Sequence, residues 1–174
     1  PEIDFTFLEE ELNRCLGELP RKTQVSSLFG LEGRASAIYF QGFSKMLRKE
    51  LKFDSRIRRP PQDPVNSLLS LGYSLITNEM FSVLVGIGFD PYIGFLHGIE
   101  YGRPSLALDL IEEFRHALID RLTLELINKE ILTKDDFEEK DEKIYLRENS
   151  LRKYFLHYEK RILTCFQDPL EGIE

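Results

Sequence analysis

The sequence has few cysteines, no long membrane-spanning apolar run and no excess of basic residues. Its 174 residues include only two cysteines, Cys15 and Cys165. These form neither a CxxC metal pair nor a disulfide framework, so we expect a reduced, cytoplasmic setting. No signal peptide is evident, and the longest apolar run is well short of a membrane span. We therefore expect a soluble protein with no membrane partner.

Basic side chains are in the minority. The chain has 23 Lys and Arg against 30 Asp and Glu, which gives a formal net charge of -7. This balance argues against a generally basic nucleic-acid-binding surface, so any DNA contact must come from a local cluster of cations. At 42% hydrophobic, the chain is long enough for one sizeable core and too short for two. We expect one mainly α-helical domain over residues 1–174.

Apolar residues recur at helical spacing through most of the chain. They predict a surface helix over 3–19 and an amphipathic helix over 26–51. The small residues of the second helix predict close packing. Its GLEG motif lacks the GxGxxG spacing and the preceding strand of a phosphate loop, so we assign it a packing role. A short helix or hairpin-like connection is expected over 130–148, followed by a final helix over 149–166 and a frayed tail over 168–174.

Two long apolar helices are predicted in the middle of the chain, over 66–89 and 105–129. Glu79 is the only ionisable side chain of the first, and helical spacing places it on the apolar stripe, away from water. A buried carboxylate is costly unless it is paired, protonated or bound to a cation, so a compensating partner is expected nearby. The second helix is apolar on all sides and carries Asp109 and Glu112 on one face.

The loop between these helices presents His97 beside glycines that let backbone and ligand come close. Together, Glu79, His97 and Glu112 would offer nitrogen and oxygen ligands. Such ligands suit Mg²⁺ or Mn²⁺ better than zinc, since no cysteine is near them in sequence. Two alternatives stay open: His97 is an ordinary hydrogen-bonded loop residue, or Glu112 pairs with Arg115 or His116 one turn on.

A linker rich in proline and cations is predicted over 52–64, because its prolines cannot continue a helix. The most basic patch of the chain lies there: Arg56, Arg58 and Arg59. One interpretation is a solvated loop, which describes most charge runs. The other is a phosphate clamp beside the metal, because the loop leads into the Glu79 helix and arginine suits bidentate phosphate contact. Tyr101 and Arg103, which flank the His97 loop, are similar candidates.

Several long motifs of this chain occur together in one known family: GLEGRASAIYF, RPPQDPVNSLLSLGY, NE and DPYIGFLHGIEYGRPSLALDLIEEFR. In this order they closely resemble the CRISPR-associated endonuclease and integrase of spacer acquisition, the Cas-one family. The resemblance runs from about Leu28 to Arg121, and more loosely to Tyr158. His116 replaces a common proline and Thr77 a common aromatic residue, and neither touches the matched ligands.

The resemblance implies a divalent-metal site. A glutamate, a histidine and an acidic residue bind the metal in the family, and they match Glu79, His97 and Glu112. Asp109 matches a further acidic position and would support the site. The resemblance also favours the phosphate clamp, with these candidate nucleic-acid contacts: Arg58, Arg59, Tyr101 and Arg103.

The implied function is a Mg²⁺- or Mn²⁺-dependent endonuclease and integrase that inserts foreign double-stranded DNA into a CRISPR array. The expected partners are a second copy, as a homodimer, and the small second adaptation subunit. The sequence shows nothing like the family's β-rich N-terminal domain and Pro1 is no natural start, so we expect a fragment, or the helical half of a truncated or fused protein. A non-catalytic helical scaffold or dimerisation fragment is the alternative. An unrelated metal phosphohydrolase is weaker, because neither an adjacent His-Asp pair nor HExxH occurs.

Overall fold

The fold is known from a computed structural model that describes residues 3–47, 51 and 53–164. Helices dominate this part of the chain, which confirms the mainly α prediction. The elements are α1 (Thr6–Glu18), the 3-10 turn η1 (Leu19–Arg21), α2 (Val25–Met46), α3 (Pro64–Gly86), α4 (Ser105–Phe114), the π-helical segment η2 (Arg115–Asp120), α5 (Arg121–Asn128), the 3-10 turn η3 (Lys134–Asp136), β1 (Phe137–Lys140), β2 (Lys143–Leu146) and α6 (Glu148–Ile162).

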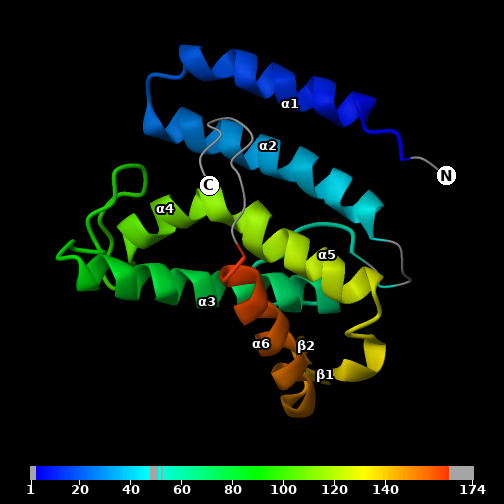
Figure 1. Ribbon diagram of the computed structural model, residues 1–174. Coiled ribbons are helices and arrows are strands. Elements are labelled where there is room, and N and C mark those ends of the chain that lie inside the picture. The colour runs from blue at the N-terminus through cyan, green and yellow to red at the C-terminus, as the bar shows by residue number, and fades with distance from the viewer. Residues whose placement is uncertain (1–2, 48–50, 52, 165–174) are drawn as a thin grey trace.

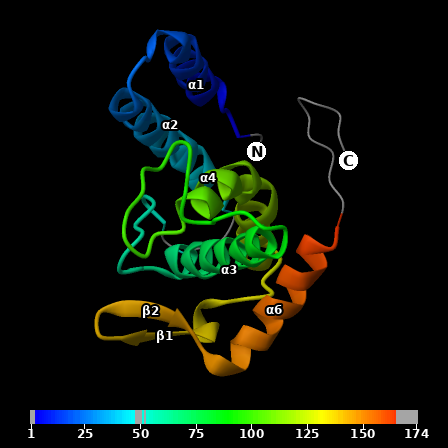
Figure 2. The ribbon, with the colours of Figure 1, turned by 90° about the vertical axis from the view of Figure 1, so that its left-hand side faces the viewer.

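The helices are stacked in layers. Figure 1 shows α1 and α2 as a side-by-side pair above the line formed by α4, η2 and α5, with α3 beneath that line. In the view turned by 90°, the hairpin of β1 and β2 lies on the far side of α3 from the α1–α2 pair, and α6 crosses beside them (Figure 2). The two strands pair antiparallel, Phe137 opposite Leu146. Both the short helix and the hairpin allowed for after residue 130 are present.

The main core is built around the first half of α3. Leu68 and Leu69 are fully buried there and pack with Leu122 and Leu126 of α5 and with Tyr154 of α6. α1 covers α2 through a separate small apolar cluster of Leu8, Cys15, Leu31 and Ile38. The site described below lies between these two layers.

One glycine brings three elements into close contact. A Cβ on Gly72 would lie 2.5 Å from Cγ2 of Ile119 and 2.6 Å from the hydroxyl of Tyr154. A residue without a side chain is therefore needed at Gly72. It is not needed at Gly86, where an added Cβ would meet nothing within 4 Å.

α3 continues beyond the core. After Ile76 only Leu84 is buried, and Val83 and Val85 are more than half exposed. By length and apolar composition alone this helix could cross a membrane. The expectation that every apolar run is well short of a membrane span was therefore wrong for α3. Its first half instead packs inside the protein, and its apolar second half extends toward the His97 loop.

The predicted helix over 105–129 is interrupted. α4 ends at Phe114, and the next six residues form the π-helical segment η2 before α5 begins. A π-helix has i→i+5 hydrogen bonds and takes an extra residue into its turn, so the phase of the following helix changes. An apolar pattern on all sides of the helix does not reveal such a change, which is why the interruption was not predicted.

A buried asparagine attaches the arginine-rich linker to α3. Asn66, fully buried, donates to the carbonyl of Ser55 and accepts from the backbone N–H of Ile57 and from Nη1 of Arg56, both at 2.8 Å. Asp63 caps the helix by accepting the Asn66 N–H at 2.8 Å. Residues 55–57 of the linker are therefore fixed beside the helix, whereas Arg58 and Arg59 are exposed.

Two further expectations concern the cysteines and the C-terminal tail. Cys15 is a free, buried cysteine, in keeping with the expected absence of a disulfide framework. Cys165 and the tail expected to fray lie outside the described residues.

Candidate metal and nucleic-acid site

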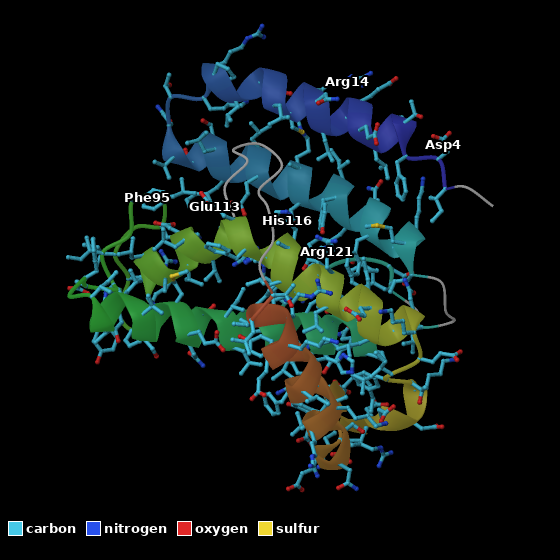
Figure 3. The ribbon with its side chains drawn as sticks, in the orientation of Figure 1. Asp4, Arg14, Phe95, Glu113, His116 and Arg121 are labelled. Atoms are coloured by element: carbon cyan, nitrogen blue, oxygen red, sulfur yellow. The ribbon has the colours of Figure 1, made fainter. Side chains whose placement is uncertain are left out.

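The loop that carries His97 is folded around one carboxylate. Asp109 is buried on α4 and accepts backbone N–H groups of Phe95, Leu96 and His97 at 2.7, 2.9 and 3.0 Å. A Cβ on Gly94 would come within 2.7 Å of the same carboxylate, so a residue without a side chain is needed there. Figure 3 labels Phe95, which extends from this loop into solvent.

Asp109 also orients the imidazole. Nδ1 of His97 lies 2.5 Å from Oδ1 of Asp109, which leaves Nε2 as the ring nitrogen free for another ligand. Burial acts to raise the pKa of Asp109, but its hydrogen bonds from Leu96, His97 and Phe95 outweigh burial and hold the pKa below the usual value. The carboxylate is therefore charged near neutral pH and supports the half-buried His97.

Glu112 lies one turn after Asp109 and is paired with an arginine. Nη1 of Arg115 lies 2.7 Å from Oε1 and 2.8 Å from Oε2 of Glu112. Of the two partners considered for Glu112, Arg115 and His116, the structure shows the pair with Arg115. Burial raises the pKa of Glu112, and the nearby charge of Glu32 raises it further, although Arg115, Arg58 and His97 oppose the shift.

His97 and Glu112 open into the same pocket, which we call the small pocket. Its volume is about 270 Å³, and its polar lining consists of Glu32, Ser36, Arg58, His97, Glu112 and Arg115. The ring of Phe29 on α2 packs at 5.3 Å from the His97 ring and forms one wall. Two carboxylates and an imidazole thus face one cavity, although no three His, Cys, Asp or Glu side chains of the described residues are arranged to hold a metal ion.

Glu32 was not predicted as a site residue. It belongs to the GLEG motif, for which we expected a packing role. That expectation is wrong for Gly30 and Gly33, which are exposed and whose added Cβ atoms would meet nothing within 4 Å. The available signal was a glutamate between two glycines, inside one of the motifs that carried the family resemblance.

Glu79 is not part of the small pocket, and the prediction that it is buried is wrong. It is exposed and accepts a hydrogen bond from the Tyr158 hydroxyl of α6 at 2.9 Å. Glu79 lies nine residues from Ser70, which lines the larger pocket described next, so the two point to opposite sides of α3. The apolar stripe around Glu79 misled because this part of α3 extends past the core.

A larger pocket, which we call the arginine pocket, adjoins the small one. It has a volume of about 890 Å³, and its lining includes all four predicted nucleic-acid contacts: Arg58, Arg59, Tyr101 and Arg103. Glu32, Arg58, Glu112 and Arg115 line both pockets. Tyr101 is fully exposed at the rim, while Arg103 donates to the carbonyl of Gly98 at 2.8 Å. The predicted cationic patch is therefore adjacent to His97 and Glu112.

A buried acid lies in the wall of the arginine pocket and was not anticipated. Asp120 of η2 accepts the hydroxyl of Tyr39 at 2.8 Å and that of Tyr73 at 2.5 Å. Burial raises the pKa of Asp120, which the two tyrosine hydrogen bonds partly oppose. The guanidinium groups of Arg56 and Arg115 lie 5.3 and 5.1 Å from the centre of the Tyr73 ring. This network ties α2, α3 and η2 together around the pocket.

Comparison with known proteins identifies the family of this chain. The family model described as "CRISPR associated protein Cas1" matches residues 4–160. One curated relative, a CRISPR-associated endonuclease Cas1 of Thermus thermophilus, is 45% identical over 163 residues, which cover 94% of this chain and 49% of the relative. The chain spans about half the length of the curated relatives it matches.

Solved structures agree in fold. A chain of a Cas6-RT-Cas1–Cas2 complex superposes with a TM-score of 0.86 at 34% identity, over 94% of this chain and 18% of that chain. A casposase bound to an integration product gives a TM-score of 0.83 at 29% identity, over 97% of this chain and 47% of that one. With the family model matched over most of the sequence, the chain belongs to the Cas1 family of CRISPR-associated proteins.

Proposed function

We propose that this chain carries the catalytic site of a metal-dependent DNA endonuclease and integrase that acts in CRISPR spacer acquisition. The observation that carries the proposal is the small pocket, where Glu32, His97 and Glu112 face one cavity beside Arg58. Relatives named CRISPR-associated endonuclease support the nuclease activity. The solved casposase with its integration product supports strand transfer as a second reaction of the same fold.

The residues of the small pocket fit Mg²⁺ or Mn²⁺ in their chemistry. Glu32 and Glu112 offer carboxylate oxygens and His97 offers Nε2, a donor set that hard divalent cations accept. The charge of Glu32 disfavours the charged form of Glu112, so a cation between them would relieve the repulsion. Glu79 has no part in this proposed set. Because Glu112 is paired with Arg115, this ion pair has to open before Glu112 can bind an ion.

When bound, the metal would supply a Lewis acid for the scissile phosphate. The residues of this chain would orient the histidine ligand and hold the phosphate. Asp109 holds His97 in the orientation that presents Nε2, and Arg58 offers a guanidinium to a phosphate at the border of the two pockets. The attacking group would be a water molecule in cleavage or a DNA 3'-hydroxyl in strand transfer.

The partners follow from the same family. We propose that double-stranded DNA binds along the arginine pocket, through Arg58, Arg59, Tyr101 and Arg103. A solved relative is part of a complex with Cas2, which supports a small second adaptation subunit as partner. A homodimer in the cytoplasm, without a membrane role, completes the proposal.

The test is a cleavage and strand-transfer assay on labelled duplex DNA with Mn²⁺ or Mg²⁺. We expect activity that EDTA abolishes and that Glu32→Gln and Glu112→Gln each lower by more than about a hundredfold, since metal ligands matter at least as much as their supporting groups. Glu79→Gln is the matched control, because it removes the same charge outside the pocket. Full activity in Glu32→Gln, or loss only in Glu79→Gln, would overturn the site.

A non-catalytic scaffold or dimerisation fragment is the second candidate. It is favoured by the finding that, within the described ranges, no three ligands are arranged around an ion. Titration calorimetry with Mn²⁺ separates the two. Saturable binding that Glu112→Gln removes supports the catalytic proposal, and the absence of such binding supports the scaffold.

A further inference from the structure

Arg115 lies where the two pockets meet. It lines both of them, and its Nη1 contacts both oxygens of Glu112, at 2.7 and 2.8 Å. One positively charged nitrogen between the two oxygens of a carboxylate occupies the place that a chelated divalent cation takes. The guanidinium and an ion on Glu112 would therefore compete for the same oxygens.

The guanidinium is also held by a support that does not involve Glu112. It lies over the Tyr73 ring at 5.1 Å, and the Tyr73 hydroxyl is fixed by its hydrogen bond to buried Asp120. Its Nε is buried and has no hydrogen-bond partner among the described residues. Arg115 thus has an aromatic platform that would keep it in the pocket and a donor that nothing yet uses.

We infer that Arg115 is an internal counter-ion that a divalent cation displaces and that then binds a DNA phosphate. In the cation-free chain its guanidinium neutralises Glu112. When a cation takes the carboxylate, the guanidinium stays on Tyr73 and turns its free donors to a phosphate in the arginine pocket. The inference rests on the proposed function, because it assumes that Glu112 binds the metal.

Two physical reasons support this exchange. A planar guanidinium matches the geometry of a phosphate as well as that of a carboxylate, so its release from Glu112 creates a phosphate site. The released charge and the incoming cation repel each other unless an anion lies between them. Cation and phosphate should therefore bind cooperatively, each raising the affinity for the other by the same factor.

The first test measures Mn²⁺ affinity by titration calorimetry. Arg115→Gln should bind Mn²⁺ about tenfold more tightly than the unaltered chain, because a competing charge that contacts the same oxygens is gone. Arg161→Gln is the matched control: Arg161 contacts Glu125 at 2.6 Å with similar exposure, outside both pockets, and its loss should leave the affinity unchanged. Equal or weaker binding in Arg115→Gln overturns the inference, because Arg115 would then only hold Glu112 in place.

The second test measures the coupling. A short duplex oligonucleotide should tighten Mn²⁺ binding by the unaltered chain, and Arg115→Gln should lose most of this gain. Coupling that persists in the variant contradicts a phosphate role for Arg115. Since Glu112→Gln tests the metal site itself, its outcome keeps the two proposals apart: Mn²⁺ binding unaffected by Glu112→Gln removes the proposed ligand, whereas binding lost there but unimproved in Arg115→Gln removes only the exchange.

A third measurement follows the unaltered chain, and a variant serves only to assign the signal. The Nε–H signal of Arg115, assigned by its disappearance in Arg115→Lys, should shift on titration with Mg²⁺ at the midpoint of ion binding. The Arg161 signal is the internal control and should stay in place. A stationary Arg115 signal at saturating Mg²⁺ would show that the guanidinium does not leave Glu112.

Discussion

Asp136 shows how much one side chain can contribute to this fold. Its carboxylate accepts the N–H of Thr133 at 2.8 Å, the hydroxyl of Ser150 at 2.6 Å and the ammonium of Lys153 at 2.9 Å. Burial acts to raise its pKa, but these hydrogen bonds outweigh burial and lower the pKa to about 2. The residue thereby joins η3 to the start of α6.

This shift predicts a pH-dependent stability. Because the folded pKa lies below the unfolded value, Asp136 stabilises the fold above about pH 4, and the contribution of about 2 kcal/mol is lost as the pH falls toward 2. Asp136→Asn should therefore unfold more easily at pH 7 and approach the unaltered chain near pH 2. Urea unfolding at several pH values measures this, with exposed Asp135→Asn as control. A difference that is the same at pH 2 and pH 7 would refute it.

Single residues also mark the limit of prediction from the sequence. The placement of Asp109 and Glu112 on one face next to His97 followed from helical spacing and loop position, and the three do lie together. The positions of Glu79 and Glu32 relative to the pocket did not follow from the sequence. Glu79 lies in an apolar helix and Glu32 in an amphipathic one. Whether either side chain points to a core, a pocket or water depends on where the neighbouring helices end, and local spacing does not contain that information.

Among the elements, α3 depends most on one close contact. Gly72 leaves room for Ile119 of η2 and for the hydroxyl of Tyr154, which is buried and without a hydrogen-bond partner in the described part of the chain. The packing of η2 and α6 on α3 is therefore set by the absence of a single side chain.

Gly72→Ala should destabilise the protein by about 1–3 kcal/mol, because the added methyl overpacks a closed contact. Gly86→Ala, on the same helix with nothing near it, should be neutral or slightly stabilising, since alanine favours a helix over glycine. Thermal melts of the two variants make the comparison. If both shift the melting temperature equally, helix propensity rather than packing is responsible.

Element boundaries were predictable where chemistry marks them. The proline pair excludes a helix in the linker. The start expected at residue 66 lies just after the observed start of α3 at Pro64, where Asp63 caps the helix. The apolar period likewise located α2, α4 and α5. No capping residue or proline indicates the start of η2. Its residues continue the same apolar pattern, and only the tertiary packing selects the wider turn.

On the scale of the whole molecule, charge is unevenly distributed. The chain has a net charge of -7, yet arginines from the linker, the His97 loop and η2 gather around one pocket. DNA should therefore be bound by a few cations on one face, against a repulsive background.

Replacing Arg58 and Arg59 together by Gln should weaken binding to all duplex sequences about equally, and the slope of log affinity against log salt should become shallower by roughly two. Fluorescence anisotropy over a range of salt concentrations measures both quantities. Arg14 and Arg152, on α1 and α6 outside both pockets, give a control double variant with the same charge change. Equal losses in the two double variants would mean that net charge alone, not the pocket, attracts DNA.

The π-helical segment lets α4 and α5 have independent rotations about the helix axis. α4 is aligned to the site, where Asp109 and Glu112 must face the His97 loop, and α5 is aligned to the core, where Leu122 and Leu126 must face α3. A continuous α-helix would fix both alignments with one rotation. The wider turn of η2 separates them, so deletion of one residue within Arg115–Asp120 would force the chain to keep either its site or its core in phase.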